Sequence, residues 1–295
     1  MKFGVREICN VVFKAKSDVK IGTSTFKAGQ PVLYIDTAKT STLEGAATTV
    51  YATGGRGNTR LIAWEGEKTL TFTVEDALLS PIGFSVLSGA GLFNNAEQDV
   101  HVHVTSSAIV INGAIDLSAS LGASETIDST AAIFAALTEE DGSVKGELIE
   151  GFSVSADGKS LTGIESEYNG STVLVDFYII KKANHAAELQ IDAENFAGSY
   201  YVEASTLFRD QATGKDLPAE ITLPNVKIQS NFSFSMAATG DPSTFTFTMD
   251  AFPGYTYFNK TKKVLCVMQV IDDSEAATKE TESVMKHLGD DESSI

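Results

Sequence analysis

Alternation of apolar and polar residues is the main pattern along this chain. The segment 68–74, KTLTFTV, alternates strictly between apolar residues and threonines. The apolar set is Leu70, Phe72 and Val74, and the threonine set is Thr69, Thr71 and Thr73. Successive side chains of a β-strand point to opposite faces of its sheet, so this pattern predicts a strand with one packed and one polar face.

The same pattern recurs towards the C-terminus. Segments 231–236 (NFSFSM) and 244–249 (TFTFTM) alternate on either side of a turn at 240–242, and segment 199–209 alternates as well. The threonines of the second segment are Thr244, Thr246 and Thr248. Because open sheet edges must be covered or paired, we expect the threonine-rich strands to continue a sheet from one subunit to the next.

One helix is predicted after the strand at 68–74. Glu75 and Asp76 precede an apolar stretch, and Ser80 before Pro81 can start a helix with proline in its first position. The stretch ends in a cluster of glycines that begins at Gly89. Its apolar residues recur at helical spacing, which indicates a helix that faces the core.

The segment 37–60 is small and polar, and we predict a long loop there. Loops of this length are uncommon in compact domains and usually meet a partner or carry function. The residues expected to make this contact are Gly54, Gly55, Arg56, Gly57, Arg60 and the single tryptophan, Trp64. The glycines lack the Gly-Lys-Ser/Thr sequence of a phosphate-binding loop, which argues against nucleotide binding.

Composition changes between residues 117 and 170, where serine, glycine, alanine and acidic residues dominate. Asp-Gly and Asn-Gly pairs there predict tight hairpins. The segment is either an inserted subdomain or a set of long hairpins that project from a core made of 1–116 and 171–271. Residues 272–295 are polar and acidic, and we expect a flexible tail.

Charge limits the kinds of partner. Lys and Arg number 22 against 39 Asp and Glu, which gives a net charge of −17. A surface of this sign does not grip nucleic acid by neutralising phosphates. Two interpretations stay open: the charge keeps the protein soluble, or it lines a path that DNA passes without sticking.

No catalytic residue, metal site or cofactor is predicted. His101 and His103 fall on one face of a predicted strand, but a third ligand for zinc is not near them in sequence, so a solvent-facing pair is expected. Cys9 and Cys266 have neither zinc nor disulfide spacing and are expected to be reduced. The N-terminus lacks the pattern of a signal peptide, and no segment is apolar over the length of a bilayer, so no membrane insertion is expected.

Several short motifs follow one another along the chain in an order that resembles the tail tube (major tail) proteins of large tailed bacteriophages. The resemblance covers roughly residues 1–115 and 173–271. In the first half it rests on Arg60-Leu61, Trp64, Gly66, Lys68, Thr71-Phe72, Asp76-Ala77-Leu78, Ser80 and Leu87. In the second half it rests on Gly198-Ser199-Tyr200-Tyr201-Val202, Phe208-Arg209-Asp210, Thr213-Gly214-Lys215, Leu223-Pro224-Asn225-Val226 and Gly240-Asp241-Pro242-Ser243-Thr244-Phe245.

The resemblance implies a mainly β fold, an antiparallel β-sandwich or half-barrel with one flanking α-helix. It implies homohexameric rings whose inner sheets join into one barrel. These rings would stack into a tube with an acidic lumen, through which double-stranded DNA passes. Implied partners are the sheath, baseplate, tape measure and terminator proteins, in a virion tail made in the host bacterial cytoplasm. Arg56 and Arg60 are expected to form salt links with acidic residues of the neighbouring ring.

Other classes remain as alternatives. A capsid decoration protein or a tail sheath protein would also be a β-rich virion component. A β-sandwich adhesin or carbohydrate-binding module would also explain the threonine-rich strands, although such a protein normally carries a signal peptide and more exposed aromatic residues. An enzyme is not expected, because the chain shows no nucleophile elbow, metal triad or phosphate loop.

Overall fold

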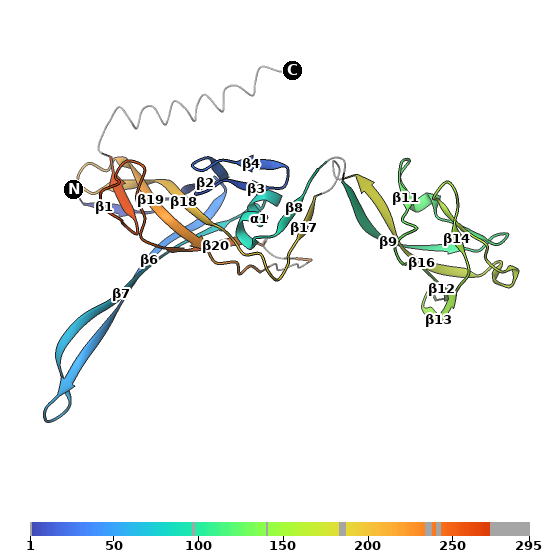
Figure 1. Cartoon of the computed structure of the whole chain (residues 1–295), viewed down its shortest axis with the longest axis horizontal. Coiled ribbons are helices and arrows are strands. Elements are labelled where there is room, and N and C mark those ends of the chain that lie inside the picture. The colour runs from blue at the N-terminus through green and yellow to red at the C-terminus, as the bar shows by residue number, and fades with distance from the viewer. Residues whose placement is uncertain are drawn as a thin grey trace, which may run out of the picture. The chain divides into compact units, whose positions relative to one another are not determined.

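Two separate hydrophobic clusters divide the chain into two units in the computed structural model. The model describes residues 2–95, 98–139, 141–182, 187–233, 238–239 and 243–271. The first, the core unit, comprises Met1–Leu92 and Leu189–Ile295, and the second, the inserted unit, comprises Phe93–Glu188. Both units are built mainly of antiparallel strands (Figure 1). The predicted mainly β fold with a single flanking α-helix is confirmed for the described residues.

The core unit is organised around one nine-stranded sheet. Seven strands follow one another across it: β5 (Pro31–Ile35), β2 (Asn10–Ala15), β18 (Ser199–Asp210), β19 (Asp216–Ile228), β20 (Phe245–Ala251), β7 (Thr59–Asp76) and β6 (Ala38–Gly54). Two more pair beside this path: β1 (Phe3–Val5) with β18, and β21 (Val267–Val270) with β19. Two small sheets complete the list: β3 (Val19–Ile21) with β4 (Ser24–Phe26), and β8 (Gly91–Phe93) with β17 (Glu188–Gln190).

One face of this sheet is packed, as the alternation predicts. Phe72 and Val74 of β7 are buried, and they share a cluster with Phe13 of β2 and with Phe247 and Met249 of β20. The residues between them on β7 and β20 point away from this cluster and stay partly accessible. An antiparallel sheet with one packed and one wet face therefore forms the centre of this unit.

The predicted helix is α1 (Pro81–Ser88), and its ends have the expected caps. The Ser80 hydroxyl accepts a hydrogen bond from the Gly83 N–H at 3.0 Å, and Pro81 occupies the first turn. The helix ends at Gly89, which has a left-handed φ of 80°, and a Cβ there would lie 2.4 Å from the Phe196 backbone. Only glycine fits this position, so the helix stops here.

The predicted loop at 37–60 is wrong, because most of that segment forms β6. β6 pairs with β7 from Ala38 opposite Asp76 to Gly54 opposite Thr59, so the two strands make one long hairpin. The hairpin extends beyond the rest of its sheet (Figure 1). Small residues such as Ala46 and Ala47 lack the apolar contrast by which strands are recognised, which is why the sequence pattern missed this strand.

The inserted unit is a small sandwich of two sheets. Its five-stranded sheet contains β9 (Asp99–Ile109), β11 (Thr126–Ile127), β12 (Phe134–Thr138), β13 (Val144–Ile149) and β16 (Thr172–Lys182). Its three-stranded sheet contains β10 (Ala114–Asp116), β14 (Ser153–Val154) and β15 (Ser160–Thr162), and two short 3-10 turns are η1 (Ser118–Ser120) and η2 (Ser166–Tyr168). Ile115, Leu161 and Phe177 from both sheets are fully buried in one cluster.

The insertion is longer than the segment 117–170 that the composition indicated. β9 and β16 lie in segments that the sequence predicts to belong to the core, but they pair with each other over their whole length, from Asp99 opposite Lys182 to Ile109 opposite Thr172. Because each completes the sheet of the inserted unit, the boundaries move outward to Phe93 and Glu188.

Three predicted features lie wholly or partly outside the described residues. Residues 231–233 are not in a strand, and the rest of the predicted strand 231–236 is outside the described part. The turn at 240–242 and the segment 272–295 are outside it as well.

Two phenylalanines on the sheet of the inserted unit should respond differently to truncation. Phe177 is fully buried, so Phe177→Ala should lower the free energy of unfolding by about 3–5 kcal/mol. Phe134 is 50% exposed on the opposite face, so Phe134→Ala is the matched control and should cost less than about 1 kcal/mol. Chemical denaturation of both variants measures the difference. Equal losses would contradict the sandwich arrangement.

Candidate assembly surfaces

The outer part of the β6–β7 hairpin, residues 44–69, is called the distal hairpin here. Its strands have no described neighbour on either face, and nearly every side chain is exposed. Five of its exposed side chains are large and apolar: Val50, Tyr51, Leu61, Ile62 and Trp64. Val50 lies opposite Trp64 and Ala52 lies opposite Ile62, so these four share one face.

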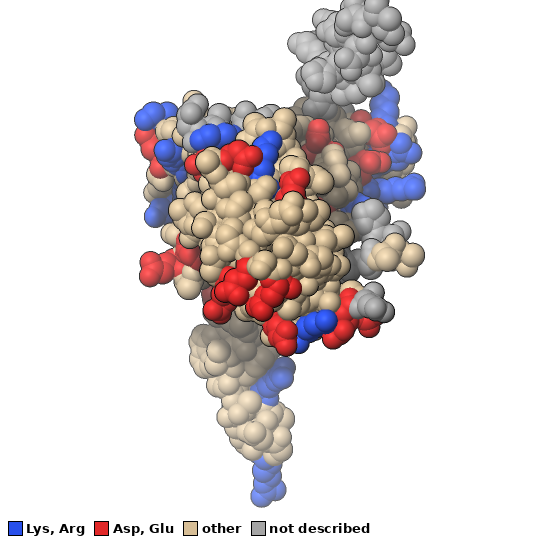
Figure 2. Space-filling view, turned by 90° about the vertical axis from the view of Figure 1, so that its right-hand side faces the viewer, with Lys and Arg blue, Asp and Glu red and all other residues tan. Residues whose placement is uncertain are grey.

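The tip of the distal hairpin is basic. Gly55 and Gly57 have φ values of 77° and 87°, which the tight turn requires and glycine adopts freely. Arg56 lies between them and is exposed, while the Arg60 guanidinium stacks 4.0 Å from the centre of the Tyr51 ring. Figure 2 shows the mostly uncharged hairpin with its basic end at the bottom of the view.

The residues predicted as a contact loop are thus brought together on one ribbon. Gly54, Gly55, Arg56 and Gly57 form its tip, Arg60 follows the turn, and Trp64 is further along β7. A two-stranded ribbon is marginal by itself in water, and contiguous exposed apolar side chains mark interaction sites. Val50 and Tyr51 are not among the residues predicted for this contact, although a strand-forming Val-Tyr pair within a segment of small residues is a signal for them.

The second surface is the wet face of β6, β7 and β20, called the threonine face here. Cross-strand partners place its members in three rows: Thr40 with Glu75 and Thr246, Thr42 with Thr73 and Thr248, and Glu44 with Thr71 and Asp250. Three of these nine residues are acidic and none is basic. The rows therefore make a polar, negatively charged surface opposite the packed face.

The predicted threonines are placed on this surface or next to it. Thr71, Thr73, Thr246 and Thr248 belong to it, and Thr69 continues the same face into the distal hairpin. Thr244 precedes β20, and its hydroxyl donates a hydrogen bond to the Glu75 carboxylate.

The threonine-rich strands β7 and β20 are not the two ends of the sheet. They pair with each other over residues 71–76 and 245–250, and each has a second neighbour in the same chain. The two ends of the sheet are β6 and β5. Alternation reports burial of a face and not which strand lies at the edge, so the sequence could not make this distinction.

Two carboxylates of the threonine face accept hydrogen bonds from neighbouring side chains. Glu75 accepts from Thr244 and, at 3.1 Å, from Thr40, and these bonds lower the pKa of its carboxyl group below the ordinary value. Asp250 accepts from the Thr71 hydroxyl at 3.3 Å and from the Gln229 amide at 3.0 Å. The Glu75 carboxyl group therefore stays charged at neutral pH.

The histidines and cysteines are not arranged as a chemical site in the described part of the chain. His101 Nδ1 lies 2.7 Å from Asp128 and His103 Nε2 lies 2.7 Å from Asp176, and both rings are half exposed. No group of three or more His, Cys, Asp or Glu residues there could hold a metal ion. Cys9 and Cys266 are free thiols. Burial raises the pKa of Cys266 to about 11, so it is protonated at neutral pH.

Comparison with known families gives one match. The sequence matches the family model described as the YomU/Tube protein family over residues 4–264, a range that covers the whole inserted unit and most of the core unit. No curated protein matches the chain. Within the described residues, no helix has the length and apolar character needed to cross a membrane.

Removing the Thr244 hydroxyl should raise the pKa of Glu75. Thr244→Val keeps the shape of the side chain but removes the donor that contributes most to the lowered pKa. The carboxyl pKa should rise towards its ordinary value, which NMR titration of the Glu75 side-chain carbon measures. The pKa of Glu75 is lower in the folded protein than in the unfolded chain. The stabilisation of the fold by the ionised Glu75 is therefore present above the unfolded pKa and is lost as the pH falls through the folded pKa.

Thr246→Val is the matched control, because no hydrogen bond joins the Thr246 hydroxyl to Glu75 among the described contacts. A Glu75 pKa that stays the same in the Thr244 variant, or moves equally in both, would disprove this account of the site.

Proposed function

Because the chain belongs to the YomU/Tube protein family and is a structural protein of the phage tail tube, we propose that its core units form hexameric rings that stack into the tube. In this proposal the threonine face lines the lumen, and the sheet edges β5 and β6 join neighbouring subunits. The observation that carries it is a nine-stranded sheet with one packed face, one polar acidic face and two open ends.

The chemistry of the threonine face suits a channel for DNA. Its charged members, Glu44, Glu75 and Asp250, repel phosphates, while threonine hydroxyls keep the surface hydrated without cations that would retain the nucleic acid. Passage without adsorption needs this combination of uniform sign and polarity. The apolar face of the same sheet cannot line the lumen, because α1 and the core side chains cover it.

Edge pairing explains how a ring can close. Unpaired N–H and C=O groups at a sheet edge are satisfied when another strand adds to it. β6 presents one edge over its inner residues 38–43, before the distal hairpin, and β5 presents the other over Pro31–Ile35. Pairing the inner part of β6 of one copy with the β5 of the next would repeat around a ring.

The distal hairpin supplies the contact between rings in this proposal. Its apolar face, with Val50, Ile62 and Trp64, packs on the adjacent ring, and Arg56 at its tip pairs with acidic residues there. The assembled tube then joins the sheath, baseplate, tape measure and terminator proteins of the virion tail.

Imaging of the concentrated protein tests the assembly. Negative-stain images should show hollow tubes of uniform width with six-fold end views. Closed trimers would overturn the proposal and favour a capsid decoration protein.

Reversing the charge at the hairpin tip should impair stacking. Arg56→Glu places an acid where the proposal puts a salt link, and losing a paired charge costs about 2 kcal/mol, or roughly a thirtyfold rise in the concentration needed for tubes. Light scattering against protein concentration measures this threshold. Arg6→Glu, an exposed arginine of the same unit, is the control. Unchanged assembly of the Arg56 variant would disprove the tip contact.

Reversing a lumen charge should make tubes retain DNA. Glu44 is exposed on the threonine face, so Glu44→Lys should leave folding intact and give assembled tubes a salt-dependent affinity for double-stranded DNA. The control Glu147→Lys makes the same charge change on the exposed strand β13 of the inserted unit and should give the tubes no affinity for DNA. Co-sedimentation of tubes with labelled DNA distinguishes them. Equal retention by both variants would exclude the threonine face as the lumen.

A further inference from the structure

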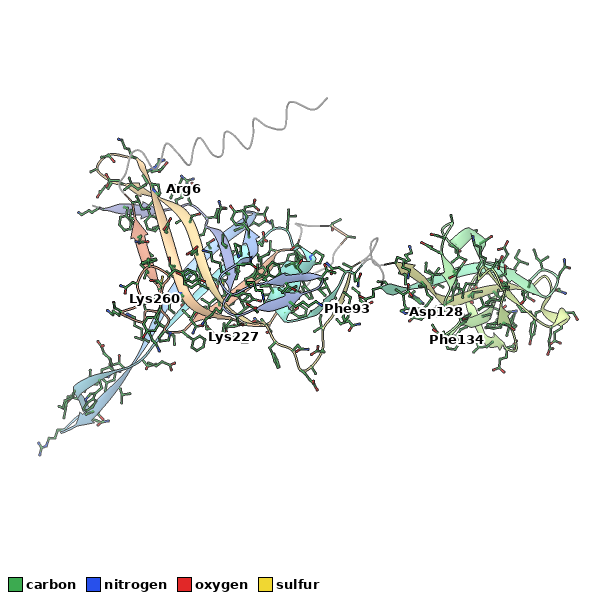
Figure 3. The ribbon with its side chains drawn as sticks, turned by 45° about the horizontal axis from the view of Figure 1, so that its top comes forward. Arg6, Phe93, Asp128, Phe134, Lys227 and Lys260 are labelled. Atoms are coloured by element: carbon green, nitrogen blue, oxygen red, sulfur yellow. The ribbon has the colours of Figure 1, made fainter. Side chains whose placement is uncertain are left out.

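One loop of the core unit differs in charge from the rest of this acidic chain. Residues 252–263, called the basic aromatic loop here, contain no acidic residue, and none occurs anywhere between Asp250 and Asp272. Four aromatic side chains and three lysines of the loop are exposed: Phe252, Tyr255, Tyr257, Phe258, Lys260, Lys262 and Lys263. Figure 3 labels Lys260 in this loop, beside the sheet of the core unit.

The loop is held in a defined conformation. The Tyr257 ring stacks on Tyr201 of β18 with centroids 4.1 Å apart, and the Tyr257 N–H donates to the Tyr201 hydroxyl at 3.3 Å. Gly254 and Val264 exchange two backbone hydrogen bonds of 3.0 and 2.9 Å, which close the base of the loop. Its cations and rings are therefore presented together rather than scattered.

The lysines of this loop have no ion-pair partner among the described residues. The Lys263 ammonium lies 5.5 Å from the centre of the Tyr255 ring. The ammonium of Lys14, which is paired with Glu203, lies 5.6 Å from the centre of the Tyr257 ring. Aromatic faces and uncompensated cations on one surface suit an anionic peptide that also carries apolar side chains.

The chain contains such a peptide. Residues 272–295 carry eight acidic side chains against two lysines, a net charge of −6. They also carry Val284, Met285 and Leu288, and methionine makes favourable contacts with aromatic rings. This segment follows directly after the last strand, β21.

The segment can reach the loop in its own chain. It begins after Ile271, whose N–H donates to Pro218 at one end of β19, and the loop begins where the Phe252 N–H donates to Asn225, further along the same strand. Seven strand residues separate these anchors by about 23 Å. A chain of 24 residues spans up to about 80 Å, so the tether is more than long enough.

We propose that the acidic segment 272–295 docks on the basic aromatic loop of its own chain. A tether of this length gives the segment a local concentration near the millimolar range, which no free ligand matches in dilute solution. Docking would neutralise the three exposed lysines of the basic aromatic loop. The inference concerns the unassembled chain and stands whether or not the threonine face lines a channel.

Hydrogen exchange of the full chain tests the docking. The amides of 255–263 should be protected from exchange at low salt. Protection should fall about tenfold in two triple variants, because each of them removes several charge pairs. One variant carries Asp290→Asn, Asp291→Asn and Glu292→Gln, and the other carries Lys260→Gln, Lys262→Gln and Lys263→Gln. A control triple variant removes the same charge from exposed lysines elsewhere and should leave this protection unchanged. It carries Lys20→Gln, Lys39→Gln and Lys68→Gln. Protection that depends on protein concentration would overturn docking within one chain.

A labelled peptide of residues 272–295 gives the second test. It should bind a chain that ends at Ile271, and bind the full chain at least tenfold more weakly, because the attached segment occupies the loop. Absence of binding to the shortened chain, or equal binding to both, would overturn the proposal. Binding of a short DNA duplex but not of the peptide by the shortened chain would assign the loop to nucleic acid instead.

Discussion

The register between β7 and β20 is the constraint on which the rest of the core unit depends. Phe72 and Val74 lie opposite Met249 and Phe247, and all four are buried. Burial of each such side chain contributes about 1.5–3 kcal/mol. A slip of β20 by one residue against β7 would move Phe247 and Met249 to the wet face and bury Thr248 and the Asp250 carboxylate instead. The same register that fills the core therefore also assembles the threonine face.

This register also fixes where the distal hairpin projects. β7 is one continuous strand, Thr59–Asp76, whose inner half is packed and whose outer half is exposed on both faces. The outer half gains its direction from the anchored half, since a ribbon without a covered face has little stability of its own. The inserted unit is different, because its own buried cluster around Phe177 makes it independent of that register.

Local pattern was enough to predict some of these features. The strand at 68–74, the helix with its Ser80 cap and its end at Gly89, and the mainly β class follow from periodicity and capping chemistry. The hairpin strand β6 did not, because a strand exposed on both faces has no apolar period. The edge strands could not be predicted, because alternation does not identify a strand's partner. The limits of the insertion could not be predicted either, because β9 and β16 alternate like core strands. The threonine face was predicted in part, since Thr40, Thr42 and Glu44 come from the missed strand.

The contrast between packed and unpacked parts connects the fold with assembly. A monomer gains almost nothing from leaving Val50, Ile62 and Trp64 in water, whereas burial against another copy would recover roughly 25 cal/mol for each Å² of apolar surface covered. The free chain therefore concentrates its stability in the two clusters and keeps the hairpin as its least protected element. If the distal hairpin acquires its contacts from a partner, as proposed, assembly and ordering of this ribbon would be one thermodynamic step. In that proposal the two buried clusters hold the free chain folded, and the apolar face of the distal hairpin is covered only in the tube.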